Sequence, residues 1–395
     1  MNKTYDIGIV GAGPVGGYIA SQLANHVDSL ALIEQHKTVG KPVNCAGLVT
    51  PRVFDMFSIP KKNIVQNEIK GAHFHSPSGK ILTIGDNKIQ ALSIDRTAFD
   101  QYLVSQAEQK KVSIFLSKKV RSIQKQKENI DVICSKDHMF SCSCLIGADG
   151  PYSKIRDLFG FPQPIEYLRG IGAVVDDVSL DPDFVEIFIG NSFAPGFFAW
   201  MIPINRKGTS ARLGLCINQK EPKSPKHYFE KLFECPPVKP FLESANIKEK
   251  MGGTIPLGAL KQTVGDNVLL VGDAAAQVKP TSGGGIYPGL ISAGHCVSTV
   301  KKAFDDNNFS KELLKSYHEA WRNDIGKELV LGMQFRKVFK NLTDKHFEKY
   351  IEKFNTPSIT AAITQYGDID YPSKLVKPIL KKVPSILRLI PQILR

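Results

Sequence analysis

The stretch VLLVGDAAAQVKPTSGGGIYPGL, residues 268–290, begins as an apolar strand, reaches Asp273 and continues into small residues and a triple-glycine turn. A helix is expected to follow from Tyr287 to Phe304. A second bare loop, GAGPVG at residues 11–16, lies near the start of the chain. Loops with so few side chains let backbone N–H groups approach a ligand closely. The sequence therefore predicts two ligand-binding loops that are far apart in the chain.

The amino-terminal loop stands between a predicted strand and a predicted helix. Residues 5–10 form an apolar strand, the glycines follow, residues 18–25 have helical spacing, and a second strand, 30–33, ends at Glu34. The glycines allow a tight turn, so that a pyrophosphate can sit at the helix N-terminus. A carboxylate at the end of the second strand can bind ribose hydroxyls. The pattern predicts dinucleotide binding but does not decide between FAD and NAD.

Composition sets limits on the class of protein. A length of 395 residues indicates two or three domains or one elaborate α/β unit, and 42% hydrophobic with 23% charged residues is typical of a soluble protein. The seven cysteines are scattered, with no C-x-x-C, which fits a reducing compartment. His73 and His75 lack a third ligand, so no metal is expected. Because no signal peptide is recognised and the uncharged run 280–300 is rich in Gly, Pro and Ser, we expect a cytoplasmic protein without a transmembrane segment.

The net charge of +13 raises the question of an anionic partner. No basic stripe is interleaved with aromatic residues, so nucleic acid is not expected. Part of the excess lies in residues 372–395, which carry six basic residues and no acidic side chain. Such a segment can rest on an anionic bilayer surface. Two short helices, broken at Pro384 and Pro391 and packed on the protein, are an equally weighted alternative.

A third motif lies between the two loops. SCSCLIGADG, residues 141–150, runs into Asp149 and Gly150, and Ser153 and Arg156 follow. G-x-G-x-x-G, then G-A-D-G-x-x-S-x-x-R, then G-D-A-A with a glycine turn resembles the flavoprotein fold of p-hydroxybenzoate hydroxylase and its relatives. The resemblance implies FAD, with Asp273 on the ribityl chain and the glycine turn beside the isoalloxazine ring. It also places Arg96 near the cofactor; taken alone, Arg96 would be a surface or capping residue.

The implied fold class is α/β (α+β): a Rossmann-like FAD-binding domain of p-hydroxybenzoate hydroxylase type with an interleaved antiparallel-sheet substrate domain and a helical C-terminal region. The FAD-binding domain is expected to comprise residues 1–70, 96–160 and 261–305, the substrate domain 71–95 and 161–260, and the C-terminal region 306–395. The residues expected to bind FAD are Gly11, Gly13, Pro14, Val15, Gly16, Glu34, Gln35, Asn44, Cys45, Ala46, Gly47, Arg96, Val120, Asp149, Gly150, Gly272, Asp273, Pro280, Gly283, Gly284, Gly285 and Ile286.

Two segments indicate which of the reactions found in this flavoprotein fold is expected here. VGKPVNCAGLVTPR, residues 39–52, resembles the cysteine loop of the geranylgeranyl reductase family, although many relatives carry Arg where this chain has Asn44. EIFIGNSFAPGFFAWMIPI, residues 186–204, resembles the reductase pattern Y-x-W-x-F-P at Trp200 and Pro203, whereas flavin-dependent halogenases carry W-x-W-x-I-P at a comparable place. The cysteine loop and the run KPTSGGGI, residues 279–286, favour the reductases, and among them the digeranylgeranylglycerophospholipid reductases.

The aromatic strand is expected to line the substrate pocket. Alternation along a strand places Phe198 and Trp200 on one face and Phe197 on the other. With Ile202 and Pro203, Phe198 and Trp200 would form an apolar wall suited to an isoprenoid chain; plain sheet core is the alternative. By resemblance, Cys45 lies near the flavin and is the candidate catalytic residue, whereas a buried, inert thiol is the alternative.

The resemblance thus implies an FAD-dependent reductase of carbon–carbon double bonds in geranylgeranyl or other isoprenoid chains, carried on glycerophospholipids and reached at the membrane surface. The electron donor stays open between NAD(P)H and a ferredoxin-like carrier, because we recognise no separate nicotinamide-binding domain. Two other functions remain in view. One is a flavin monooxygenase or halogenase of a small aromatic, and the other is a non-catalytic FAD-binding protein on a lipid surface.

Overall fold

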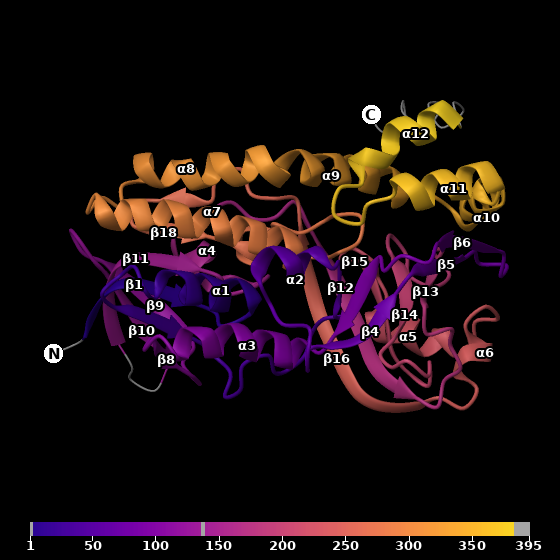
Figure 1. Cartoon of the computed structure of the whole chain (residues 1–395), viewed down its shortest axis with the longest axis horizontal. Coiled ribbons are helices and arrows are strands. Elements are labelled where there is room, and N and C mark those ends of the chain that lie inside the picture. Colours follow the sequence, from indigo (N-terminus) through magenta and orange to yellow (C-terminus); the bar gives the residue numbers. More distant parts are fainter. Residues whose placement is uncertain (1–2, 136–138, 383–395) are drawn as a thin grey trace.

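The computed structural model describes residues 3–135 and 139–382. It is a mixed α/β structure with three sheets and a layer of helices contributed by the C-terminal third of the chain (Figure 1). The expected fold class is confirmed. The division of the chain at residues 70, 95, 160, 260 and 305 stays a prediction.

The first sheet carries the amino-terminal loop. Its main path runs in the order β17 (Val264–Gly265), β18 (Val268–Leu270), β11 (Met139–Gly147), β1 (Thr4–Val10), β2 (Leu30–Ile33) and β8 (Ser113–Phe115), and β9 (Val120–Lys125) and β10 (Ile130–Cys134) extend it beside β11. All pairs from β18 to β8 are parallel. The strands are short apolar runs because both faces of the sheet are covered. Helices α1 (Pro14–Leu23), α3 (Arg96–Glu108) and α7 (Ile286–Asp305) pack on one face.

The second sheet is largely antiparallel and curves away from the first. Its order is β16 (Asn246–Leu257), β12 (Glu166–Asp176), β15 (Ser210–Asn218), β14 (Phe198–Pro203), β13 (Phe184–Ile189), β5 (Gly71–His75) and β6 (Ile81–Gly85). One face packs on α5 (Pro225–Leu232) and α6 (Lys239–Leu242). The strand period of two then sends the alternate side chains of β14 to the opposite face, toward the first sheet.

A small third sheet joins the two larger ones. It consists of β3 (Leu48–Val49), β7 (Ala91–Ile94) and β4 (Val65–Ile69), and α2 (Arg52–Phe57) follows β3. β3 lies within the predicted cysteine loop, residues 39–52, and Cys45 stands three residues before it. The position of this loop between the sheets therefore depends on β3 pairing with β7.

The helices of the C-terminal region cover one side of the molecule. Helix α8 (Lys311–Trp321) continues through a π-helical turn, Arg322–Gly326, into α9 (Lys327–Phe339). Helices α10 (Asp344–Phe354), α11 (Pro357–Tyr366) and α12 (Ser373–Lys382) then lie toward the β6 edge of the second sheet (Figure 1). The uncharged run 280–300 forms a turn and most of α7, which is buried against α1 and α8. Within the described residues, no helix is long and apolar enough to cross a bilayer.

Candidate active site

A cavity of about 670 Å³ lies between the first and second sheets. It brings together loops that are more than 200 residues apart in the chain, from Gly13 to Gly285. Its lining includes, of the predicted site residues, Gly13, Pro14, Val15, Asn44, Cys45, Ala46, Gly47, Arg96, Gly150, Asp273, Gly283, Gly284, Gly285, Ile286, Phe198, Trp200 and Ile202. The two loops singled out by the sequence thus meet at one cavity.

Gly11 and Gly16 of the amino-terminal loop are required by close backbone contacts, whereas Gly13 is not. Gly11 has φ +102°, and a Cβ at Gly16 would lie 1.9 Å from the Gly11 carbonyl oxygen. Gly13 precedes α1 with no side-chain cap, and a Cβ there would meet no protein atom within 4 Å. The N-terminus of α1 therefore faces the cavity with bare backbone, which is the geometry that binds a pyrophosphate.

Glu34 follows β2 at the same end of the first sheet. Its carboxylate accepts hydrogen bonds from Ala12 N at 2.9 Å and His36 N at 2.8 Å. Gln35 beside it is exposed. Val120 is buried in the core on the other face of the sheet and, like Glu34, Gln35 and Pro280, is not part of the cavity lining. The roles of these four residues toward a cofactor stay predictions.

The middle motif, residues 141–156, connects two loops through hydrogen bonds. Asp149 accepts a hydrogen bond from Ile155 N at 3.0 Å, and Ser153 caps α4 (Lys154–Leu158). Arg156 is fully buried and donates to the carbonyl oxygens of Ala274 at 3.3 Å and Pro151 at 3.0 Å. The G-A-D-G loop is thereby tied to the 3-10 helix Gly272–Ala275, which carries Asp273.

The Asp273 carboxylate faces the cavity. Within the described part of the chain it makes no hydrogen bond or ion pair, and burial raises its pKa to about 6, although Arg96 lowers it. A Cβ at Gly285 would lie 2.6 Å from Asp273 Oδ1, so a larger residue there would displace the carboxylate. A half-buried carboxylate without a protein donor is suited to a ligand hydroxyl.

Asp273→Asn is expected to stabilise the protein without FAD, in a pH-dependent way. The folded-state pKa is raised from 3.8 to about 6, so the penalty for burying the charge is absent below the unfolded pKa, grows as the pH rises, and is complete above about 6. The variant should gain about 1–3 kcal/mol at pH 7.5 and little at pH 4. Urea unfolding at both pH values measures this, and a gain that is equal at both would contradict it. The same variant should bind FAD more weakly.

The cysteine loop lies beside two guanidinium groups. Gly47 has φ +66° and its N–H donates to Cys45 Sγ at 3.3 Å. Arg96 pairs with Asp100 at 3.0 Å. Burial by itself lowers the pKa of Arg96, but the interactions with Asp100 and with the Cys45 side chain raise this pKa by more, so the net shift is upward. Arg212, from β15, donates to the Ala46 carbonyl oxygen at 3.3 Å. Asn44, in its flipped orientation, donates to Gly252 O at 2.7 Å, which ties the loop to β16.

The apolar wall corrects the prediction for Phe197. Phe197 lines the cavity together with Phe198, and their rings stack with centroids 4.2 Å apart. Strand β14 begins only at Phe198, so strand alternation does not apply to Phe197. Pro203 is not part of the cavity lining. It is buried at the strand end, where its carbonyl accepts a hydrogen bond from Asn67 at 3.3 Å, and its role toward a substrate stays a prediction. Trp200 lies flat on Gly214, where a Cβ would be 2.6 Å from the indole ring.

Sequence reasoning missed the segment Asp368–Pro372, which closes one side of the cavity. Asp370 is buried and accepts hydrogen bonds from Lys279 Nζ at 2.7 Å and Thr50 Oγ1 at 2.5 Å. Asp368 is paired with Arg52 at 2.7 Å. Burial opposes ionisation of Asp368, but Arg52 and Lys374 outweigh it and hold the Asp368 pKa well below its usual range. No motif marks these residues, since Thr50, Arg52 and Lys279 come from distant parts of the chain.

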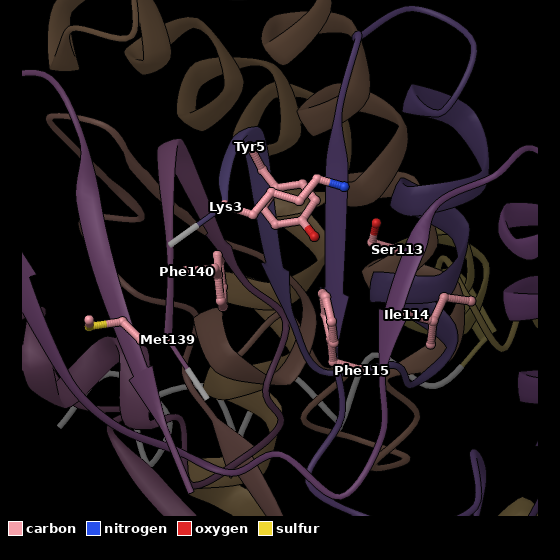
Figure 2. Close-up of a pocket in the computed structure, with 7 residues that line it drawn as sticks. All are labelled: Lys3, Tyr5, Ser113, Ile114, Phe115, Met139 and Phe140. Atoms are coloured by element: carbon pink, nitrogen blue, oxygen red, sulfur yellow. The ribbon is translucent and has the colours of Figure 1, made fainter. Parts of the chain in front are cut away.

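Two other features lie away from this cavity. An open hollow of about 520 Å³, lined by Lys3, Tyr5, Ser113, Ile114, Phe115, Met139 and Phe140, contains no predicted site residue (Figure 2). It includes the amino ends of the parallel strands β1 and β11, whereas ligands of such sheets bind at the carboxyl ends. His73 and His75 both contact Glu186, at 2.9 and 2.5 Å, on the sheet face opposite to Phe74, which lines the large cavity.

The large cavity fits FAD in its chemistry. The bare N-terminus of α1 would hold the pyrophosphate, the unpartnered carboxylate of Asp273 would accept from the ribityl chain, and the glycine turn Gly283–Gly285 leaves backbone exposed beside the isoalloxazine position. Fold and site together define a flavoprotein oxidoreductase with FAD as its cofactor.

The comparisons with known proteins agree with this class. Residues 4–331 match the family model described as FAD binding domain. The chain is 30% identical to a digeranylgeranylglycerophospholipid reductase of Methanocaldococcus jannaschii, over 98% of each chain. This protein therefore belongs to the FAD-binding-domain family of flavoproteins and, within it, to the family of the digeranylgeranylglycerophospholipid reductases.

Solved structures show the same fold. A geranylgeranyl bacteriochlorophyll reductase-like protein of Thermoplasma acidophilum superposes with a TM-score of 0.87 at 19% identity, covering 99% of each chain. A p-nitrophenol 4-monooxygenase of Pseudomonas putida gives 0.72 at 16% identity, covering 94% of this chain and 98% of its own. At these identities the likeness concerns the fold alone.

Proposed function

We propose that this protein is an FAD-dependent reductase that hydrogenates carbon–carbon double bonds of isoprenoid chains on glycerophospholipids. The observation that carries the proposal is the cavity in which the flavin loops face an apolar wall of Phe197, Phe198, Trp200 and Ile187. A polyisoprenoid chain requires such a wall, because it offers few polar groups for recognition. The name of the Methanocaldococcus relative points to the same substrate class.

In this proposal FAD supplies the hydride when it is bound. The chain's own residues would position and enclose the reactants. An unactivated alkene is a poor hydride acceptor, so the double bond must be held close and kept from water. The stacked rings of Phe197 and Phe198 would exclude water on one side. Cys45 and Gly47 would lie at the flavin end, with Cys45 as the candidate catalytic residue.

The test is anaerobic reduction followed by mass spectrometry of the lipid. Purified protein reduced with dithionite is expected to convert a glycerophospholipid with geranylgeranyl chains into products heavier by about two mass units per double bond, because each turnover transfers one hydride and one proton. Omission of the reductant is the control. Unchanged lipid, with FAD shown to be bound and reduced, would reject the proposal and favour oxygen-dependent assays on aromatics. Replacing dithionite by NAD(P)H or by a reduced ferredoxin would identify the electron donor.

Docking on an anionic membrane surface is a second part of the proposal. Helix α12 carries Lys374, Lys377, Lys381 and Lys382 and no acidic residue. Residues 383–395, including the predicted helix breaks at Pro384 and Pro391, lie outside the described residues. The membrane role of the tail rests on its charge and amphipathic sequence.

Neutralising three lysines of α12 is expected to weaken binding to anionic vesicles. Lys377→Gln, Lys381→Gln and Lys382→Gln together should lower affinity roughly 100-fold at low salt, since each basic residue near such a surface contributes about 1 kcal/mol. Lys374 is kept because it bonds to Asp368. The matched control neutralises the exposed lysines Lys226, Lys231 and Lys239 of α5 and α6. Equal vesicle sedimentation of both triple variants would remove the membrane role of α12.

A further inference from the structure

Phe197 forms part of the apolar wall without being part of a strand. β14 begins at Phe198, and Phe197 follows Gly196, whose φ is +75°. The pleat of a strand therefore does not fix the direction of the Phe197 side chain. Its ring is nevertheless buried, lines the cavity and stacks on Phe198 with centroids 4.2 Å apart. Other contacts must hold this ring in place.

Arg336 of α9 supplies such contacts. It is 3% exposed, and its guanidinium lies over the Phe197 ring with Cζ 5.6 Å from the centroid. Nη1 donates to the carbonyl oxygen of Gly196 at 2.9 Å, and Nε donates to Glu166 at the start of β12. A guanidinium at this distance attracts an aromatic ring, and its planar fork can hold several groups at once. Arg336 therefore ties Gly196 and Phe197 to two other elements, α9 and β12.

The same ring and the same helix both contact the glycine turn that is expected to lie beside the flavin. A Cβ at Gly283 would lie 3.5 Å from Phe197 Cζ, so the ring lies against this turn. A Cβ at Gly332, one helical turn before Arg336 in α9, would lie 2.8 Å from Pro280 Cδ. The separation between the glycine turn and the apolar wall therefore depends on α9 and on its arginine.

Stability alone does not require an arginine at this place. Arg336 Nη2 is buried and has no hydrogen-bond partner among residues 3–135 and 139–382, and Glu166 also accepts from Lys340 at 3.3 Å. Replacing a buried ion pair by apolar residues of similar volume is often neutral or stabilising. An apolar side chain could not bond to the Gly196 carbonyl oxygen while it packs on the ring. The arrangement therefore favours a geometric role.

We propose that Arg336 is a positioning residue that, by holding Phe197, sets where the double bond of the substrate lies relative to the flavin. A displacement of about 1 Å can slow a step that depends on close approach by roughly 100-fold. Arg336 is not part of the cavity lining, so it acts through Phe197 and not on the substrate directly. The inference rests on the proposed function and on the place of the flavin beside Gly283.

Arg336→Met tests the inference, with Lys340→Met as its matched control. Lys340 lies on the same helix and shares the Glu166 carboxylate, whereas the ring contact belongs to Arg336. With the FAD-loaded, dithionite-reduced protein and a glycerophospholipid bearing geranylgeranyl chains, kcat of Arg336→Met should fall roughly 10- to 100-fold. KM should stay within about threefold, because the apolar lining that binds the chain is kept. Lys340→Met, which removes a partly exposed ion pair, should leave both values within about threefold.

A double-mutant cycle with Phe197→Leu shows whether Arg336 acts through this ring. Phe197→Leu should lower kcat by itself, and adding Arg336→Met should change kcat further by less than about twofold, because the contact is already lost. If the two effects multiply, Arg336 does not act through Phe197 and the inference is overturned. A raised KM with unaltered kcat in Arg336→Met would also overturn it, since that pattern indicates a loss of uniform binding.

The ion pair allows a second variant if Arg336→Met does not fold. Combining Arg336→Met with Glu166→Gln removes the carboxylate that would otherwise be left behind. Glu166→Gln alone, which keeps the guanidinium over the Phe197 ring, is then the control. The same kinetic outcomes decide between a positioning role and none.

Hydrogen exchange without lipid separates this inference from the proposed function. The Phe197 amide, which donates to Ala194 O at 3.0 Å, should exchange at least roughly tenfold faster in Arg336→Met than in Lys340→Met, because a segment that is held less firmly opens more often. Equal exchange in the two variants overturns the inference whether or not the lipid is reduced. If the original protein holds reduced FAD but leaves the lipid unchanged, the proposed function is rejected, while faster exchange in Arg336→Met would still show that Arg336 holds the wall.

Discussion

Gly16→Ala is expected to abolish FAD binding. A Cβ at this position would lie 1.9 Å from the carbonyl oxygen of Gly11, and a backbone atom cannot give way as a flexible side chain can. The turn between β1 and α1 must then open, and the N-terminus of α1 is displaced from the cavity. We expect FAD affinity to fall by at least about 1000-fold and stability by roughly 3–5 kcal/mol, the range of the most disruptive single substitutions. Fluorescence titration with FAD and urea unfolding measure the two effects.

Gly13→Ala separates cofactor binding from folding. A Cβ at Gly13 meets no protein atom within 4 Å but points into open space at a residue that lines the cavity. Stability without FAD should therefore stay within about 1 kcal/mol of the original, while FAD binding weakens. Gly294→Ala, in α7, also meets nothing within 4 Å and is away from the cavity lining, so it should leave FAD binding unchanged. A Gly16→Ala protein that purifies with a full complement of FAD would disprove the assignment of the Gly11–Gly16 turn to FAD binding.

Asp370→Ala is expected to release the segment that closes the cavity. It leaves Lys279, whose side chain is 10% exposed, without its carboxylate partner. Breaking one side of a buried ion pair costs about 3–5 kcal/mol, because the remaining charge is uncompensated. The loss should appear as local opening, with faster hydrogen exchange and proteolysis within residues 367–372. It should also weaken substrate and FAD binding, since Asp368, Ile369, Asp370 and Pro372 line the cavity.

The control for this variant is an ion pair of similar length at the surface. Lys70 and Asp183 are also 2.7 Å apart, but their side chains are 32% and 34% exposed. Asp183→Ala should cost at most about 1 kcal/mol and leave the exchange of residues 367–372 unaltered. Replacing both Lys279 by Met and Asp370 by Leu should recover part of the stability lost in Asp370→Ala. A single Asp370→Ala variant that is no less stable than Asp183→Ala would show that the pair does not hold the segment.

The loops could be predicted because each imposes a local backbone requirement. The spacing of Gly11, Gly13 and Gly16 meets the demands of one strand–turn–helix unit, and the structure has strand β2 at residues 30–33, as predicted. Phe197 was placed on the wrong face because strand alternation was extended one residue beyond the true strand start. Pro203 was assigned to the pocket by resemblance, and its role stays a prediction, since its carbonyl is bonded to Asn67 outside the cavity lining.

The sequence by itself determined the cofactor class and the order of the motifs, because the three motifs together resemble one flavoprotein fold and the Gly16–Gly11 contact spans only five residues. Other glycine contacts, such as that of Gly11 with Ala148, form only in the tertiary structure. Tertiary structure alone decided which charges surround the cavity. Asp370 bonds to residues 91 and 320 positions away, and Arg212 reaches Ala46 over 166 positions. Arginine, lysine and aspartate occur throughout the chain, so no local pattern distinguishes a buried one from an exposed one. Their burial and pairing arise only when the sheets meet.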